Sequence, residues 1–314
     1  MNELIVKTMP IFLFIGMGYF FKTTQFLTSE QMGALKKLVV NMVLPAVLFL
    51  TFLRMEIGLQ VLGATLGIIL MCSIFMGLGY LLNLTGLLKN PTVPFMMTSF
   101  AFGFLGIALF ATVFGEENLQ YIALLGIGHE LFVWTLYVLF MKVRLGEERV
   151  TAAFLMAFLR SPIILGVVLG ILLNVAGLYG PLQASLWGQG ILSTIQMVTA
   201  LSSPLIFLIV GHGIAFDRKY ILQSFWYTVL RYLLIFSAGY LFKFLVLDRF
   251  LEQSQLMDYA FFVFLLLPPP VSLPILIASY SKKQEHVDLT NNMVVFSTIA
   301  SLLLFMGFVV WKGI

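Results

Sequence analysis

A histidine and a glutamate stand side by side in an apolar part of the sequence, as His129 and Glu130 of "GIGHELFVWTLY". If the segment 120–141 crosses a bilayer as a helix, both residues lie about 15 Å from its start, at about 1.5 Å per residue, and therefore near the membrane midplane. Ionisable groups at that depth are costly and are typical of ion or substrate pathways. The pair could carry a coupling proton, or it could satisfy other buried polar groups.

One further charge and two uncharged polar groups also fall inside apolar segments. Arg231 lies ten residues into the segment 222–247. Its guanidinium could clamp a carboxylate or extend along the lipid to the headgroups. Asn41 and Ser202 each come shortly before a proline of their own segment, where a helix loses backbone hydrogen bonds. We therefore take Asn41, Ser202 and Arg231 as candidate binding residues.

The spacing of these groups does not favour enzyme chemistry. The stretch "HELFV" lacks the second histidine of a zinc protease motif, and no other histidine, cysteine or carboxylate cluster has the spacing of metal ligands. The sequence also lacks a phosphate-binding loop that would support an ATP-driven pump. We therefore expect no catalytic residues, no cofactor and no metal centre, only a coupling ion, H⁺ or Na⁺.

The composition places these groups in a membrane protein. Of the 314 residues, 61% are hydrophobic and 10% are charged, whereas about a quarter of the residues in a typical soluble domain are charged. No Asp, Glu, Lys or Arg occurs from residue 161 to residue 216. The net charge of +4 comes mostly from residues near the ends of apolar segments, which fits membrane orientation better than nucleic acid binding. We expect a multi-pass protein of the plasma membrane.

A helix needs about 20 apolar residues to cross a bilayer. This length predicts ten spans with short links, at 4–22, 34–54, 59–82, 93–115, 120–141, 161–179, 191–214, 222–247, 259–280 and 291–311. Residues 143–160 begin with charges and end apolar, which predicts an interfacial helix. Twelve lysines and arginines lie at the links after odd-numbered spans and five on the opposite side. Both termini are therefore predicted outside the cytoplasm.

Two predicted spans carry helix breakers near their centres. The segment 259–280 contains three consecutive prolines in "LPPPVSLP", and the segment 93–115 contains two glycines in "AFGFLG". Non-helical backbone at that depth survives only beside protein or a water-filled cavity. There the amino-terminal ends of half-helices can bind an anion; a packed proline kink is the alternative. The predicted binding residues at these breaks are Ser99, Gly103, Gly106, Pro269, Pro270 and Ser272.

The two halves of the chain also resemble each other. "PIFLFIGMG", from Pro10, and "PIILGVVLG", from Pro162, share Pro, Ile, Leu and Gly at four matching positions. Because each half would hold five spans, residues 1–152 and 153–314 would insert in opposite orientations, as in many secondary transporters; chance likeness among apolar segments is the alternative. A separate alignment of Gly106 with Pro268 pairs His129 and Glu130 of the fifth span with Asn291 and Asn292, at the opening of the tenth. Glycines four residues apart in the third and sixth spans predict close helix packing.

These motifs together resemble the auxin efflux carrier family of bacterial and plant transporters, over nearly the whole chain. The likeness rests on "LVVNMVLPAVLF", "FGFLGIAL" with "FGEE", "SSPLIFLIVGHGI", "PPPVSLPILIASY" and "VVFSTIASLLL". The chain departs from the family at "AFGFLG", where members often have an asparagine. The resemblance implies ten helices, of which the fourth and ninth cross at the substrate site. Spans one, two, six and seven would form a scaffold, and spans three to five and eight to ten a moving transport domain.

The resemblance further implies a substrate class and an assembly. Family substrates are organic anions, such as malate and malonate in bacteria and auxin in plants, and likeness to the plant carriers implies a homodimer. We therefore predict a secondary transporter of a small mono- or dicarboxylate in the lipid bilayer, coupled to protons and working by alternating access. The alternative is a sodium-coupled symporter of larger organic anions, as in the related bile-acid symporters. An intramembrane enzyme or a passive channel is the third reading.

Overall fold

The computed structural model describes residues 2–55, 59–86, 88–145, 160–214, 218–270, 272–281 and 283–313. Within these ranges the chain is helical and contains no strand, so the predicted all-α class is confirmed. The amphipathic helix predicted at 143–160 lies mostly outside the described residues.

The helices follow one another in a serpentine order. They are α1 (Asn2–Thr23), α2 (Ser29–Leu38), η1 (Val39–Val43), α3 (Leu44–Arg54), α4 (Leu59–Leu84), α5 (Val93–Thr98), η2 (Phe102–Gly106), α6 (Ile107–Phe114), η3 (Glu116–Asn118), α7 (Leu119–Phe132), η4 (Val133–Tyr137), α8 (Val138–Leu145), α10 (Pro162–Val175), α11 (Tyr179–Ala184), α12 (Leu186–Thr199), α13 (Ser202–Gly213), η5 (Arg218–Tyr220), α14 (Ile221–Leu245), η6 (Leu247–Arg249), α15 (Gln255–Leu266), α16 (Leu273–Tyr280) and α17 (Gln284–Lys312). The elements η1, η2 and η4 are single π-helical turns inserted between α-helices.

Several helices of the described chain have the length and composition of membrane spans. Six are long and apolar enough to cross a bilayer: Ser29–Arg54, Val61–Leu84, Glu116–Leu145, Leu186–Gly213, Arg218–Arg249 and Gln284–Lys312. Three shorter apolar helices are Met9–Thr23, Pro162–Val175 and Gln255–Leu266. The described chain thus contains six full-length candidate spans where the sequence predicted ten, and their length and apolar composition fit the predicted membrane protein.

Local chemistry explains where two spans depart from their predicted bounds. The second apolar segment begins at Ser29 instead of residue 34, because Thr28 and Gln31 form a capping box in front of it. The prediction that Asn291 opens the tenth span is wrong, since α17 already begins at Gln284 and holds Asn291 in its third turn. A helix can extend past its apolar stretch when its first turns reach water.

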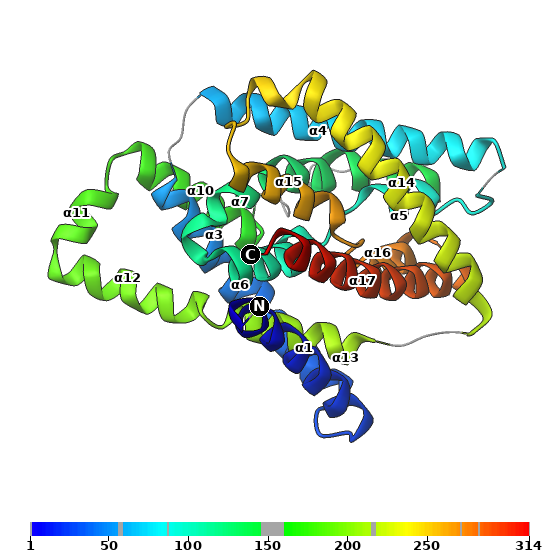
Figure 1. Ribbon diagram of the computed structural model, residues 1–314, viewed down its shortest axis with the longest axis horizontal. Helices are drawn as coiled ribbons and strands as arrows, with labels where there is room; N and C mark the ends of the chain where they lie inside the picture. The colour runs from blue at the N-terminus through cyan, green and yellow to red at the C-terminus, as the bar shows by residue number, and fades with distance from the viewer. Residues whose placement is uncertain are drawn as a thin grey trace.

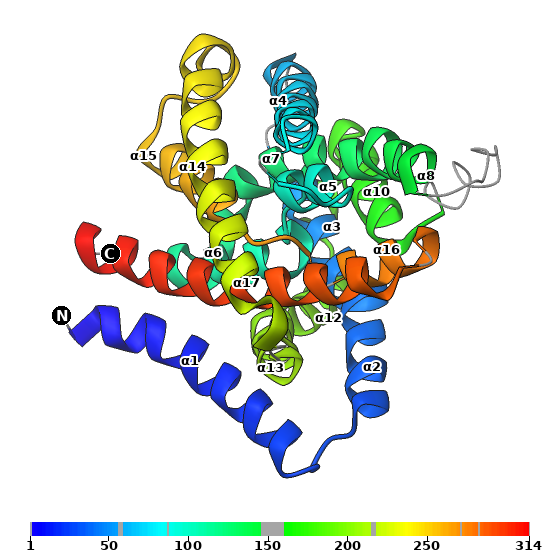
Figure 2. The same cartoon turned by 90° about the vertical axis from the view of Figure 1, so that its right-hand side faces the viewer.

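Figure 1 shows how the helices run back and forth along the long axis of the molecule. The end of α4 and the start of α14 lie at the right-hand end, whereas the starts of α4 and α15 lie farther to the left. The start of α1 and the end of α17 lie close together in Figures 1 and 2. The two ends of the chain therefore share one side of the molecule.

Glycines bring two pairs of helices into close contact. α1 packs along α13, and α3 packs along α10. A Cβ atom at Gly166 would lie 2.5 Å from the carbonyl oxygen of Pro45, and one at Gly170 would lie 2.6 Å from that of Phe49. These distances leave no room for a larger side chain, which confirms the close packing predicted from the glycine spacing in the sixth span.

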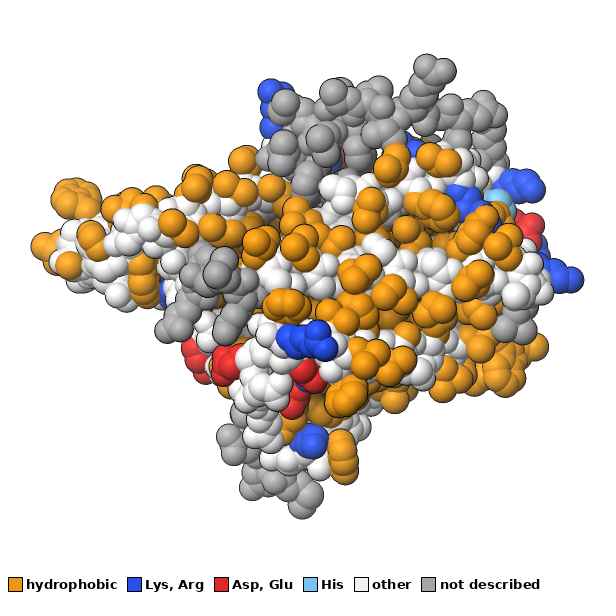
Figure 3. All heavy atoms as spheres, turned by 90° about the horizontal axis from the view of Figure 1, so that it is seen from above, with side chains coloured by type: hydrophobic (Ala, Val, Ile, Leu, Met, Phe, Trp, Pro, Cys, Tyr) orange, Lys and Arg blue, Asp and Glu red, His pale blue; other side chains and the backbone are white. Residues whose placement is uncertain are grey.

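The surface of the molecule is largely apolar, as Figure 3 shows for one face. An arm made of α11 and the first turns of α12 projects from one end of the molecule and carries apolar and uncharged side chains. The largest buried cluster lies at the opposite side of α3 from this arm and includes side chains of α4 to α7 and α15. The non-helical breaks lie inside this cluster.

Candidate functional site

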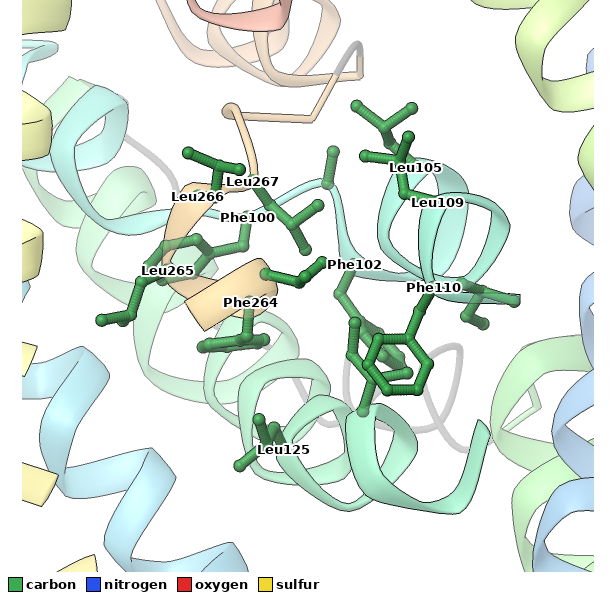
Figure 4. Close-up of a cluster of buried hydrophobic side chains, with 14 of the residues drawn as sticks. Phe100, Phe102, Leu105, Leu109, Phe110, Leu125, Phe264, Leu265, Leu266 and Leu267 are labelled. Atoms are coloured by element: carbon green, nitrogen blue, oxygen red, sulfur yellow. The ribbon is translucent and has the colours of Figure 1, made fainter. Parts of the chain in front are cut away.

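The two breaks predicted from proline and glycine meet inside the molecule. α5 ends at Thr98 and the chain is non-helical to Ala101, while α15 ends at Leu266 and helix resumes only at Leu273. The backbone amide of Ala101 donates a 2.7 Å hydrogen bond to the carbonyl oxygen of Pro268. Figure 4 shows the two extended segments crossing at this point. The crossing is hereafter called the crossover, meaning residues 99–101 and 267–270.

Different sequences break the two helices. Leu267 adopts an extended conformation, with φ −59° and ψ 138°, because the ring of the following proline excludes the helical region. Ser99, which no proline follows, is also extended, with φ −83° and ψ 147°. Its carbonyl group must therefore be held by partners outside its own helix.

Arg231 supplies most of those partners. Its side chain is fully buried, and Nη1 donates to the Met96 carbonyl at 2.7 Å. Nη2 donates to the carbonyls of Ser99, at 2.8 Å, and Leu267, at 3.0 Å. The guanidinium also lies 5.0 Å from the ring centroid of Phe100. Arg231 therefore neither extends to the headgroups nor presents a free fork to a carboxylate; it joins the two breaks.

Two tyrosine hydroxyls complete the capping of the broken helices. Tyr137, in η4, donates to the Phe95 carbonyl at 2.9 Å. Tyr232 donates to the carbonyls of Leu266, at 3.1 Å, and Ser297, at 3.0 Å. The sequence analysis missed both tyrosines. A hydroxyl next to an arginine in mid-span, as in the Arg231–Tyr232 pair, was the available signal for one of them.

The electrostatics of the crossover follow from which helix ends meet there. The carboxyl ends of α5 and α15 each carry about half a negative charge, so together they amount to about one unit. The guanidinium of Arg231 offsets that charge, because it donates to carbonyls of both ends. The amino-terminal ends that follow the breaks, at η2 and α16, keep their positive partial charges. This balance favours an anion near those amino-terminal ends.

His129 touches the same crossover from α7. The amide of Phe100 donates to its Nε2 atom at 3.1 Å, so Nε2 acts as an acceptor and Nδ1 carries the proton of the neutral ring. Nδ1 is buried without a hydrogen-bond partner among the described residues and lies 3.6 Å from Oε1 of Glu130. The His129 side chain is 2% exposed and that of Glu130 is 19% exposed. A proton on Nε2 of His129 would therefore disrupt its contact with the Phe100 amide, at the break that follows α5. A proton on Glu130 would change its contact with Nδ1 of His129.

The glycines and prolines predicted at the breaks lie around this centre. A Cβ at Gly106 would lie 2.7 Å from a methyl group of Leu267, so the glycine permits the close approach of the two breaks. Gly103 faces the start of α3, where a Cβ would lie 3.9 Å from Leu44. Pro269 is buried.

The remaining residues predicted for the breaks divide between the interior and the surface. Ser99 is buried and donates from Oγ to the Phe95 carbonyl at 3.0 Å. Pro270 is half-buried, and Ser272 is exposed. Of these three, only Ser99 is wholly enclosed by the packed side chains around the crossover.

Three other predicted site residues lie elsewhere. Asn41, in η1, and Asn291, in α17, are exposed. Composition alone does not show which face of its helix such a residue occupies. Ser202 is buried at the start of α13 and lines a different cavity. Asn292, next to Asn291, is the buried member of that pair, and its Nδ2 donates to the Ser224 hydroxyl at 3.2 Å.

The cavity that Ser202 lines is polar. It has a volume of about 60 Å³ and lies between α3, η3, α7, α12 and α13, where Arg54, Glu116 and Gln196 face it. A neighbouring cavity of about 420 Å³ shares Arg54 and Gln120 with it. Both are lined by Arg54, the last residue of α3, and by Gln120, in the first turn of α7.

The chain matches no protein-family model and no curated protein. The site must therefore be interpreted from its own geometry.

Proposed function

We propose that this protein is a secondary transporter of a small mono- or dicarboxylate, coupled to protons, in the plasma membrane. The crossover would bind the anion, and Glu130 with His129 would carry the coupling proton. The observation on which this proposal depends most is the hydrogen bond between Ala101 and Pro268. It brings two broken helices together in the interior of an apolar protein, where non-helical backbone is tolerated only when it is buried in protein or lines a cavity. It also brings the amino-terminal ends that follow the two breaks near one another, where they can attract an anion.

The arrangement of the helices supports a ten-helix inverted repeat of the auxin efflux carrier kind. If residues 1–152 and 153–314 are copies, span one corresponds to span six, and span two corresponds to span seven. The contact of α1 with α13 then becomes the contact of α10 with α3, and both contacts occur. We propose that these helices, with α2 and α12, form the scaffold and that the remaining helices form the transport domain. The neighbouring termini are consistent with an even number of crossings, and the charge count puts both outside the cytoplasm.

The charge balance at the crossover supports an anionic substrate. Arg231 is occupied by carbonyl groups of both breaks, so its charge offsets those carboxyl ends and leaves the amino-terminal ends to a ligand. We propose that the carboxylate binds beside Gly103 and Ser272, because both lie at these amino-terminal ends and neither is fully buried. Gly103 also faces α3, a proposed scaffold helix past which the transport domain would slide.

The position of His129 supports a coupling role for the pair. Neutral His129 accepts the Phe100 amide through Nε2, and a proton on that atom would replace an attraction by a contact between two donors. Protonation would therefore alter the first break. Glu130 is the more accessible partner, so it would exchange the proton with water.

Flux into proteoliposomes tests the proposal directly. Uptake of labelled malonate and malate should be saturable and driven by a proton gradient, with no chemical product formed. Glu130→Gln should abolish gradient-driven uptake while keeping exchange of internal for external substrate. Glu285→Gln, an exposed carboxylate at the start of α17, is the matched control. If the flux of Glu130→Gln equals that of the wild type at every pH, the coupling role is rejected. If uptake by the wild type depends on a sodium gradient alone, the sodium-coupled alternative is favoured.

The projecting arm supports the proposed homodimer. Leu186, Trp187 and Met197 of α12 are 85%, 88% and 72% exposed, and uncharged Gln189 and Thr194 lie exposed on the same helix. Amides and hydroxyls facing hydrocarbon are costly, so we propose that a second copy covers them. The protein part of the detergent complex should then have twice the 35.2 kDa of one chain by light scattering. Trp187→Lys should shift it to the monomer.

A further inference from the structure

An apolar groove lies on the outer side of the second break. It has a volume of about 750 Å³ and is lined by residues of α14, α15 and α17, which pack against one another and cross in Figure 2. Its lining is apolar apart from Tyr232, Ser237 and the indole nitrogen of Trp311. A groove of this size and composition can enclose most of an apolar ligand.

One end of the groove carries a lysine without a carboxylate partner. Lys312 Nζ lies 4.3 Å from the ring centroid of Trp311, which lines the groove, and 5.9 Å from that of Tyr259. No ion pair of Lys312 occurs in the part of the chain that the structure describes. Lys243, on α14, instead pairs with Asp248 at 2.6 Å. A tryptophan with an adjacent lysine is typical of the level of lipid headgroups.

The opposite end of the groove reaches the crossover. Tyr232 lines the groove with its ring, and its hydroxyl donates to the Leu266 carbonyl, the last residue of α15. Leu266 itself also lines the groove. Whatever occupies the groove therefore packs against two residues that hold the second break in place.

We propose that the groove binds one acyl chain of an anionic phospholipid from the surrounding bilayer, with the lipid phosphate at Lys312. The apolar lining fits a hydrocarbon chain, and the unpaired cation fits a negative headgroup. In a bilayer, hydrocarbon surrounds every apolar surface, so the headgroup contact at Lys312 distinguishes this lipid from its neighbours. Its occupancy stabilises the packing of Tyr232 and Leu266 and hence the crossover. The inference requires a membrane protein but not the transport activity proposed above.

Thermal unfolding of the purified protein in detergent tests the site. Phospholipids with identical acyl chains and either a phosphatidylglycerol or a phosphatidylcholine headgroup are added, and the shift in Tm is measured. The wild type should show the larger rise with the anionic lipid. Gly307→Phe fills the groove and should lose the rise with both lipids, because an added Cβ there meets no atom within 4 Å and the ring can enter the open space. Lys312→Gln should reduce the anionic shift to the zwitterionic one.

Gly77→Phe is the matched control, because Gly77 lies exposed on α4 and an added Cβ there also meets no atom within 4 Å. It should keep the wild-type shifts. Equal shifts of the wild type with the two lipids, or an undiminished shift in Gly307→Phe, would overturn the proposal. If Gly307→Phe does not fold, native mass spectrometry of the wild type and Lys312→Gln decides. An anionic lipid retained equally by both would reject the site, and its selective loss from Lys312→Gln supports it.

Discussion

Ala101 and Pro268 share a backbone hydrogen bond of 2.7 Å, although they belong to opposite halves of the chain. Each lies in a segment that has left its helix, so each has a backbone group with no partner in its own helix. Their bond satisfies one donor and one acceptor at once. Side chains from α14 and η4 donate to several other carbonyls at the two breaks.

Loss of the Arg231 guanidinium should destabilise the protein strongly. Arg231→Leu leaves the carbonyls of Met96, Ser99 and Leu267 without this donor, and each buried unsatisfied group costs about 1–3 kcal/mol. We expect a large fall in Tm on thermal unfolding in detergent, or failure to recover folded protein. Arg249→Leu, at an exposed position of η6, should change Tm little. Equal Tm values for the two variants would contradict the capping role.

Removal of the Tyr137 hydroxyl should have a smaller effect of the same kind. Tyr137→Phe removes one of two side-chain donors to the Phe95 carbonyl, the other being Ser99 Oγ, while it preserves the buried ring, so we expect a loss of about 0.5–1.5 kcal/mol. Thermal unfolding measures the difference. Tyr240 is 42% exposed, and Tyr240→Phe serves as the control that should unfold like the wild type. A Tyr137→Phe variant as stable as this control would show that the bond contributes nothing.

Substitutions of His129 should separate its structural role, as the acceptor of the Phe100 amide, from its proposed role in proton coupling. His129→Leu removes the acceptor of the Phe100 amide and should lower both Tm and carboxylate flux, because a buried donor is left unpaired. His129→Gln offers an oxygen in place of Nε2 and should restore much of the stability, yet it cannot titrate. Flux driven by a proton gradient should therefore stay low in His129→Gln. Full recovery of both quantities would assign the residue a structural role alone.

Close contact between α3 and α10 should be sensitive to side-chain size. Gly170→Leu would place a Cβ 2.6 Å from the Phe49 carbonyl oxygen, and the two backbones would have to separate. Overpacking of this kind typically costs about 1–3 kcal/mol. Gly77→Leu, on α4, meets no atom within 4 Å of its Cβ and should change stability little. The Tm of the two purified variants gives the comparison, and a tolerant Gly170 would mean that the helices can move apart.

The sequence by itself determined the membrane class, the approximate apolar segments and the two breaks. These features are local: hydrophobicity is summed over about 20 residues, and the ring of Pro268 excludes the helical region at Leu267 whatever surrounds it. Helix bounds were less accurate where polar turns extend a span, as at Gln284 of α17.

Only the tertiary structure decided which groups meet at the breaks. Arg231 was compatible with a lipid-facing, a ligand-binding or a buried role, and the choice depended on the carbonyls that α5 and α15 bring within 3.0 Å of it. The positions of Asn41 and Asn291 at the surface depended likewise on how their helices are rotated. Hydropathy is averaged over about 20 residues and does not depend on which way a side chain points. A hydrogen bond, in contrast, requires two atoms to lie within about 3 Å of each other in a favourable direction. That second condition is set by packing between segments distant in the chain.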